Sequence, residues 1–218
     1  DKLRAALPIY LLVVVGLSFA LLALVFRSIL VPIKATAGFL LTIAATFGVT
    51  VAVFQWGWLA SLVGLDKAGP LVSFLPILLI GILFGLAMDY EVFLVSRMRE
   101  DFVHGETARE AVVSGVGHGA RVVVAAGLIM ISVFSGFILV HDATVKSMGF
   151  ALAFGVLVDA FLVRLTLVPA VMSFLGDAAW WLPRWMDRAM PNVDIEGESL
   201  RTPVSAPVPG PQLTGTGA

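Results

Sequence analysis

The sequence predicts an all-α integral membrane protein, a polytopic bundle of about five transmembrane helices. Of its 218 residues, 59% are hydrophobic. The mean hydropathy is +1.00 and only 13% of the residues are charged. The apolar residues also fall into runs of about 20, the length that a helix needs to cross a bilayer. Helix is the expected conformation, because a lone strand in lipid would leave its backbone groups unpaired and no barrel-like alternation is visible.

Five apolar runs, taken in chain order, are expected to span the membrane and to form one domain over residues 1–175. They cover residues 7–26, 35–56, 71–96, 122–140 and 149–173. Between the first two, Arg27-Ser-Ile-Leu-Val-Pro32-Ile-Lys34 predicts a tight turn and antiparallel neighbours, since Pro ends one helix before the next begins. The chain opens on Asp1 without a Met, so we expect a fragment of a longer protein.

Positive charge predicts the orientation of the spans. Cytoplasmic connections carry an excess of Lys and Arg, so the richer set of connections should face the cytoplasm. We therefore expect a multi-pass protein of the cell membrane, with its N-terminal end outside and its C-terminal end in the cytoplasm. The richer set holds Arg27, Lys34, Arg97, Arg99, Arg109, Arg121, Arg184 and Arg188, and the poorer set holds Lys2, Arg4, Lys67 and Lys146.

Three segments outside the spans have their own character. Residues 97–121 form the longest cytoplasmic connection, and the capping-box pattern Thr107-Ala-Arg-Glu110 predicts a short amphipathic helix on the membrane surface, with a solvated connector as the alternative. Residues 176–198 suit the headgroup layer, and residues 199–218 have too few apolar side chains to fold. The aromatic and basic residues of the headgroup segment are Trp180, Trp181, Arg184, Trp185 and Arg188.

Four ionisable residues lie inside the spans: Asp89, Glu91, Asp159 and Arg164. A charge at the bilayer centre costs about 3 kcal/mol, so each is a candidate functional residue. Asp89 and Arg164 should lie at comparable depth and could meet. Asp159 is turned about 140° from Arg164 around one α-helix, so its partner is expected on another helix. Glu91 points about 200° away from Asp89 and is expected to reach the headgroups.

Two interpretations of these charges remain open at this point. One is a structural ion pair, with Asp89 or Asp159 neutralised by Arg164 to hold two helices in register. The other is a proton relay, in which a buried acid gains and loses a proton as Arg164 approaches and withdraws. Tyr90 would add a phenolic donor beside the acid, or else be a packed aromatic residue with its hydroxyl satisfied locally.

The segment Gly85-Leu-Ala-Met-Asp89-Tyr90-Glu-Val-Phe-Leu-Val-Ser-Arg-Met resembles the Asp-Tyr signature of the MmpL family, within the resistance-nodulation-division (RND) superfamily of proton-driven exporters. Other stretches resemble the second half of that family in the same order. The combination is far more specific than Asp-Tyr alone. The stretches are Val31-Pro-Ile-Lys34-Ala, the run from Glu110 to Arg121, Leu157-Val-Asp159-Ala-Phe-Leu-Val-Arg164-Leu-Thr-Leu-Val-Pro169-Ala and Trp181-Leu-Pro-Arg-Trp-Met-Asp187.

The resemblance implies a transporter of twelve transmembrane helices, of which this chain would be the C-terminal membrane half. It implies that Asp89, Tyr90, Asp159 and Arg164 belong to a proton relay, with a second Asp-Tyr pair on the missing N-terminal half. The implied function is export of lipids, glycolipids or hydrophobic compounds, driven by the proton-motive force. The implied partners are the lipid bilayer, the substrate and the N-terminal half, with further copies of the same chain as an option.

Other classes fit the sequence less well. An intramembrane aspartyl protease could use Asp89 with Asp159, but a nearby Arg164 would keep both ionised, and Gly-x-Gly-Asp is absent around Asp159. A non-transporting, sterol-sensing-like module remains an alternative, because fold does not fix function. The expected protein is not an enzyme. No catalytic residue, cofactor, metal site or nucleic-acid partner is predicted, and the chain has no Cys for thiolate ligands.

Overall fold

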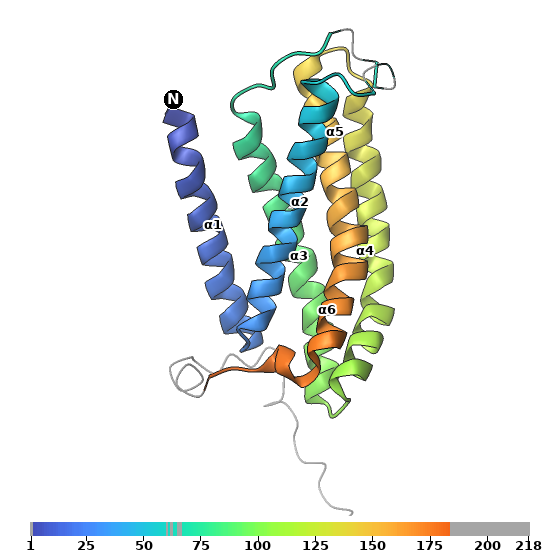
Figure 1. Ribbon diagram of the computed structural model, residues 1–218. Coiled ribbons are helices and arrows are strands. Elements are labelled where there is room, and N and C mark those ends of the chain that lie inside the picture. The colour runs from blue at the N-terminus through green and yellow to red at the C-terminus, as the bar shows by residue number, and fades with distance from the viewer. Residues whose placement is uncertain (1, 60, 62, 65–66, 184–218) are drawn as a thin grey trace, which may run out of the picture.

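The computed structural model describes residues 2–59, 61, 63–64 and 67–183 as a bundle of long helices lying side by side (Figure 1). No strand occurs in this part of the chain. The elements are α1 (Lys2–Phe26), α2 (Leu30–Phe54), α3 (Leu75–Val103), α4 (Ala108–Ile138), α5 (Ala143–Leu157), the π-helix η1 (Val158–Leu167), α6 (Val168–Leu175) and the 3₁₀-helix η2 (Gly176–Trp180).

The chain runs up and down through the bundle, with α5, η1 and α6 forming one continuous helical path (Figure 1). Five stretches of the described residues are long and apolar enough to cross a membrane. The predicted fold class, a multi-pass helical membrane bundle, is therefore confirmed. The five stretches are Leu7–Phe26, Leu30–Phe54, Leu75–Val103, Ala108–Ile138 and Ala143–Trp180.

The second span begins earlier than residue 35, where the sequence suggested. Arg27 has a positive φ of 45° at the turn, and α2 starts at Leu30. Pro32 lies in the first turn of α2, where its missing N–H is not needed, so it does not delay the helix. Lys34 is consequently part of α2 and is buried, rather than a charge in a cytoplasmic connection.

The segment 97–121 also differs from the expected loop with a surface helix. The capping box at Thr107 and Glu110 is present, but it starts the long helix α4. α3 runs on to Val103, so the two helices form a tight hairpin. They touch closely at Gly115, where a Cβ would lie 2.9 Å from the backbone nitrogen of Met98. A side chain at this position would collide with backbone, which explains the glycine.

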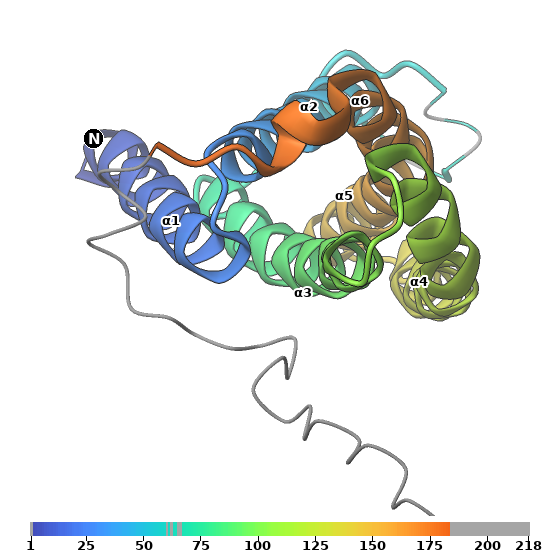
Figure 2. The ribbon, with the colours of Figure 1, turned by 90° about the horizontal axis from the view of Figure 1, so that it is seen from below.

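Seen from below, α1 and α4 lie at opposite ends of the bundle, with α3 and α5 between them (Figure 2). The spans differ in burial. Of the most apolar 18-residue stretch, 22% is buried in Leu7–Phe26 and 61% in Ala143–Trp180. In Ala108–Ile138 only 11% is buried. The last span is therefore the central element of this bundle, and α4 and α1 are its two most exposed helices.

The chain after α6 folds back under the bundle. Trp180 is 8% exposed, stacks on Phe102 with ring centroids 5.5 Å apart, and has the Arg99 guanidinium 5.2 Å above its ring. Ser28 donates a hydrogen bond of 2.6 Å to the carbonyl of Ala179. Trp180 thus packs against α3 at this end of the bundle, and its predicted place in the headgroup layer stays a prediction. Trp181 is 58% exposed, and Arg184, Trp185, Arg188 and residues 199–218 lie outside the described residues.

Candidate functional site

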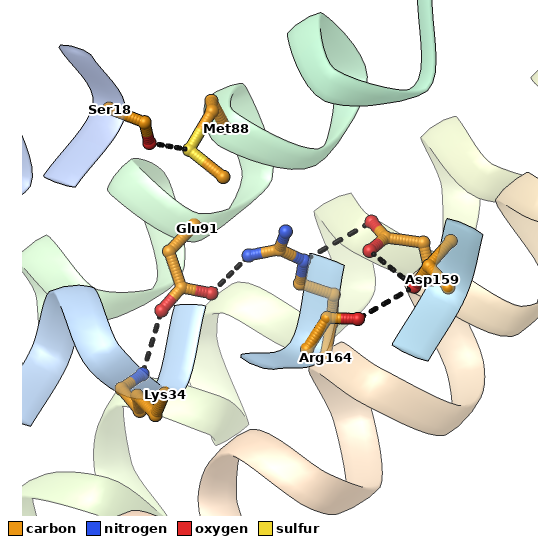
Figure 3. Close-up of polar contacts among 8 residues, drawn as sticks. Ser18, Lys34, Met88, Glu91, Asp159 and Arg164 are labelled. Carbon is orange, nitrogen blue, oxygen red and sulfur yellow. Dashed lines mark hydrogen bonds and ion pairs between the residues drawn. The ribbon is translucent and has the colours of Figure 1, made fainter. Parts of the chain in front are cut away.

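Four charged side chains from three elements meet inside the bundle (Figure 3). Lys34 comes from α2, Glu91 from α3, and Asp159 and Arg164 from η1, and none is more than 6% exposed. The Lys34 Nζ donates to Glu91 Oε1 at 2.7 Å, and the Arg164 Nη1 pairs with Glu91 Oε2. The Arg164 Nε donates to Asp159 Oδ2 at 3.2 Å, and the Thr42 hydroxyl donates to Asp159 Oδ1 at 3.3 Å. We call these five residues the charge network.

The charge network is balanced in both charge and hydrogen bonding. Each of the four carboxylate oxygens of Glu91 and Asp159 lies within hydrogen-bonding distance of one side-chain donor, and the single hydrogen of the Thr42 hydroxyl is shared with the Gly38 carbonyl at 3.1 Å. With all four groups ionised, two cations and two anions sum to zero. A single unpaired ion in such surroundings would cost several kcal/mol, and pairing with satisfied oxygens offsets that cost. The arrangement therefore allows four charges to remain within an apolar bundle.

The Asp159–Arg164 contact joins two residues of one helix, which the sequence had made doubtful. The expectation fails because Val158–Leu167 is π-helical. The i→i+5 hydrogen bonding of a π-helix widens the turn and brings residues five apart onto the same side, whereas an α-helix separates them by about 140°. Thr166 follows the same spacing, with its hydroxyl donating to the Phe161 carbonyl at 3.0 Å. Such π segments are frequent at functional sites.

Two glycines on neighbouring helices leave the space that the wide π turn occupies. A Cβ on Gly38 of α2 would lie 2.7 Å from Val163 Cγ1, and a Cβ on Gly127 of α4 would lie 3.2 Å from the Cβ of Ala160. Pro169 follows directly at the start of α6 and lacks the N–H that would bond back into η1. Flanking glycines and a following proline thus explain locally why the sequence accommodates a π segment here.

Asp89 and Tyr90 lie apart from the charge network. Asp89 is exposed on α3, and within the described residues Arg164 pairs with Glu91 and Asp159 instead of Asp89. Tyr90 is half-buried and donates to the sulfur of Met130 at 3.7 Å. The structure therefore brings two of the four predicted relay residues, Asp159 and Arg164, into contact, whereas the Tyr90 hydroxyl contacts Met130 and Asp89 is exposed.

Sequence reasoning missed three members of the charge network. Glu91 does not reach the headgroups: it is 0% exposed and bound by two cations. Lys34 was assigned to a connection, and Thr42 drew no attention. A signal was nevertheless present, because a buried stripe of polar or small residues recurs at every fourth position of α2, as expected for a helix face turned toward a polar partner. The stripe consists of Lys34, Gly38, Thr42, Thr46 and Thr50.

The two aspartates do not form a paired-carboxylate site. A protease dyad needs two acids that share a proton at close range. Asp89 is exposed, whereas Asp159 is 5% exposed and ion-paired to Arg164. The geometry provides buried charge and hydrogen bonds, suited to holding or passing a proton, rather than an acid-base pair beside a substrate cleft.

These features define a multi-pass membrane protein with a neutral charge network buried among its central helices. The chain matches the MMPL family over residues 3–194 and belongs to that family, within the RND superfamily. The residues that match the family include every residue of the charge network, as well as Asp89 and Tyr90.

Three relatives place the chain within the family. It is 55% identical over 200 residues to "Membrane protein YdfJ" of Bacillus subtilis (strain 168), covering 92% of this chain and 28% of the relative. It is 42% identical to the "Mycolic acid-containing lipids exporter MmpL11" of Mycolicibacterium smegmatis, over 90% of this chain and 20% of the relative. It is 36% identical to the "Trehalose monomycolate exporter MmpL3" of Mycobacterium tuberculosis, over 88% and 20%. The chain thus spans less than a third of the length of each.

Proposed function

We propose that this chain is the C-terminal membrane half of an exporter of lipids, glycolipids or hydrophobic compounds, driven by the proton-motive force. The observation that carries the proposal is the charge network, in which four ionisable groups are buried between α2, α3 and η1. Ionisable groups at this depth are costly, and in transporters they mark proton and ion pathways. A purely structural bundle would gain equal cohesion from apolar side chains.

The substrate class follows from the relatives. Two of them are named as exporters, one of mycolic acid-containing lipids and one of trehalose monomycolate. Since they share 42% and 36% of their aligned residues with this chain, a lipid or similarly hydrophobic substrate is the natural proposal. Substrate contacts outside the aligned fifth of those proteins would complete the specificity.

The relay would comprise Asp89, Tyr90, Asp159 and Arg164. Asp89 lies on the exposed side of α3, where it would face the N-terminal half of the transporter. A proton on Asp89 changes the field at Tyr90 and, through it, at Asp159. Arg164 then shifts its balance between Asp159 and Glu91, and because these lie on η1 and α3, the shift biases how the two elements sit against each other.

The energetics set a minimum for the driving force. One unit charge crossing 100 mV is worth about 2.3 kcal/mol, whereas inverting a two-state population from 1:99 to 99:1 needs about 5.5 kcal/mol. The membrane potential on one proton is therefore too small. A pH gradient or a second proton has to supply the difference, and the two acids Asp89 and Asp159 provide two sites.

The proposed orientation puts the hairpin between α3 and α4 in the cytoplasm and the N-terminal end of this chain outside. Three arginines, Arg97, Arg99 and Arg109, lie at or next to this hairpin. Labelling single cysteines with an impermeant maleimide tests it. In intact cells a cysteine replacing Gly105 in the hairpin should stay unlabelled, and one replacing Gly69 in the loop before α3 should react. The reverse pattern would overturn the orientation.

The function is tested with the complete transporter in liposomes under an imposed pH gradient, with transfer of a labelled lipid as the readout. Asp89→Asn should reduce transfer to the rate seen without a gradient. Asp177→Asn, an exposed residue of η2, is the matched control and should transfer at the wild-type rate. Normal gradient-driven transfer by Asp89→Asn would remove its proton-carrying role. Lipid binding without any gradient-driven transfer would favour a non-transporting lipid-sensing module.

A further inference from the structure

Lys34 and Glu91 lie outside the proposed relay, yet Glu91 is bonded directly to its Arg164 and Lys34 is bonded to Glu91. Glu91 uses one carboxylate oxygen for the Lys34 ammonium and the other for the Arg164 guanidinium. Arg164 in turn is shared between Glu91 and Asp159. The strength of the Arg164–Asp159 bond therefore depends on how well Lys34 neutralises Glu91.

The outer partners of both acids come from one helix. Lys34 binds Glu91 and Thr42 binds Asp159, and the two residues lie eight positions apart on α2. Between them, Gly38 presses against Val163 in the π turn that holds Asp159 and Arg164 together. α2 thus supplies the outer partner of each acid and, between these two residues, packs against the π turn.

We propose that Lys34 and Glu91 are positioning residues that set the pH at which Asp159 takes up its proton. This inference rests on the proposed proton relay and deepens it. The pair acts through Arg164: a neutral Lys34–Glu91 pair leaves the guanidinium to Asp159, and an unbalanced Glu91 draws it away.

The groups that face Asp159 come from every element packed around it. Arg164 lies on its own helix, Thr42 and Lys34 on α2, and Glu91, Tyr90 and, further out, Asp89 on α3. The neighbouring helix α4 contributes Gly127 to the η1 contact. In the described parts of α4, α5 and α6, the ionisable side chains are Arg109, Glu110, His118 and Arg121 of α4, all exposed, and Lys146 at the start of α5. Lys146 binds the Val63 and Gly64 carbonyls instead.

The two residues should act with opposite signs. Glu91→Gln removes a negative charge and leaves Arg164 wholly to Asp159, so Asp159 keeps its negative charge down to lower pH. Lys34→Met removes a positive charge and leaves Glu91 to attract Arg164, so Asp159 takes up its proton at higher pH. The double variant Lys34→Met with Glu91→Gln keeps the net charge at zero and should return the midpoint toward the wild-type value.

The size of each shift follows from Coulomb's law. A unit charge about 8 Å away in surroundings of effective dielectric constant about 20 moves a titration midpoint by about one to two pH units. Merely structural roles would not produce opposite shifts that cancel in the double variant. They would lower activity in all three variants without moving the midpoint.

The experiment measures two quantities on the complete transporter. One is the pH midpoint of gradient-driven lipid transfer in liposomes. The other is the infrared carboxyl band of purified protein, followed against pH and assigned to Asp159 by its loss in Asp159→Asn. Both midpoints should fall by at least about one unit in Glu91→Gln, rise by a similar amount in Lys34→Met, and return in the double variant. Glu100→Gln, also a paired carboxylate of α3 but 43% exposed, and Lys67→Met, an exposed lysine, should leave both unchanged.

The outcomes separate the two proposals. Wild-type lipid transfer at the same rate with and without a pH gradient overturns the proposed function. The infrared midpoints of Asp159 in the variants then still test whether Lys34 and Glu91 set its titration. Gradient-driven transfer with single variants that do not move in opposite directions, or a double variant that does not return, overturns the inference alone. If one single variant does not accumulate, the midpoint of the other single variant is compared with that of the double variant. The single variant must be shifted in its expected direction and the double variant must not be. If neither single variant accumulates, the double variant must still titrate as the wild type does, and a shift of a unit or more overturns the inference.

Discussion

Two acids of α3 that are only two residues apart lie on opposite faces of the helix and differ in burial. Glu91 is 0% exposed and held by Lys34 and Arg164, whereas Asp89, turned about 200° around the helix, is exposed. The folded chain therefore neutralises one acid with its own cations and leaves the other exposed. Glu91 is an internal anchor, and under the proposed function Asp89 is the acid that would face the N-terminal half.

The neighbours of the two acids repeat the contrast. Met98, seven residues after Glu91 and thus on the same side, is 0% exposed and lies against Gly115 of α4. Gly85, one turn before Asp89, has open space where a Cβ would stand. The Glu91 face is closed by α2, α4 and η1 of this chain. On the other face, Gly85 and Asp89 leave room for a further helix to approach.

The largest loss of stability is expected for Arg164→Met, which acts on the closed face. It leaves Asp159 without a cation and Glu91 with Lys34 alone. Breaking a buried ion pair by removing one partner costs about 3–5 kcal/mol. Unfolding of the purified transporter in detergent, followed by tryptophan fluorescence, measures it. Arg97→Met is the matched control, because Arg97 pairs with Glu100 at 53% exposure and such pairs contribute about 0–1 kcal/mol. Equal losses would contradict the distinction between the faces.

The spans were predictable from sequence because membrane thickness fixes their length. All five runs were found, since about 20 apolar residues leave little choice of conformation. The ends were less predictable. Pro32 suggests a later helix start although a helix tolerates it in the first turn, and the stacking of Trp180 on Phe102 beneath the Arg99 guanidinium leaves no signal in the local sequence. Such ends depend on contacts between segments far apart in the chain.

The candidate site was half predictable. Charge in an apolar run identified Asp159 and Arg164, but assigning them partners assumed 100° per residue throughout. The π-helix at Val158–Leu167 breaks that assumption and creates the pair. Glu91 and Lys34 were misplaced because their burial depends on which helices pack around them, and position along an apolar run does not reveal that.

A close contact on the closed face gives the next largest effect. In Gly115→Val the new side chain would meet the Met98 backbone nitrogen at 2.9 Å, and backbone cannot move aside as a flexible side chain can. Overpacking of this kind costs about 1–3 kcal/mol. Gly136→Val in the same helix controls for helix propensity, because it has nothing within 4 Å. The difference between the two unfolding free energies gives the cost of the contact. No difference would mean that α3 and α4 separate without penalty.

A smaller effect is expected for the hydroxyl that binds the charge network. Thr42→Val removes a hydroxyl whose one hydrogen is shared between the Gly38 carbonyl at 3.1 Å and Asp159 Oδ1 at 3.3 Å, and the loss costs about 0.5–1.5 kcal/mol. Thr50→Val is the matched control, since the Thr50 hydroxyl only donates to the Thr46 carbonyl in its own helix. Thermal unfolding of both variants should rank Thr42→Val as the more destabilising. The opposite ranking would show that the hydrogen bond to Asp159 contributes little to the stability of the network.

The smallest effect on stability is expected for Asp89→Asn, the variant predicted to abolish gradient-driven transfer. Asn keeps the size of Asp and a hydrogen-bonding side chain, and the described part of the chain closes no packed shell around this exposed position. Substitutions of that kind usually change stability by about 0.5 kcal/mol or less. Unfolding and lipid transfer measured on the same preparation should therefore dissociate: intact stability with lost transfer at Asp89, and lost stability at Arg164. A loss at Asp89 as large as that at Arg164 would mean that the acid is an anchor on both faces of α3, and the division of roles between Asp89 and Glu91 would fall.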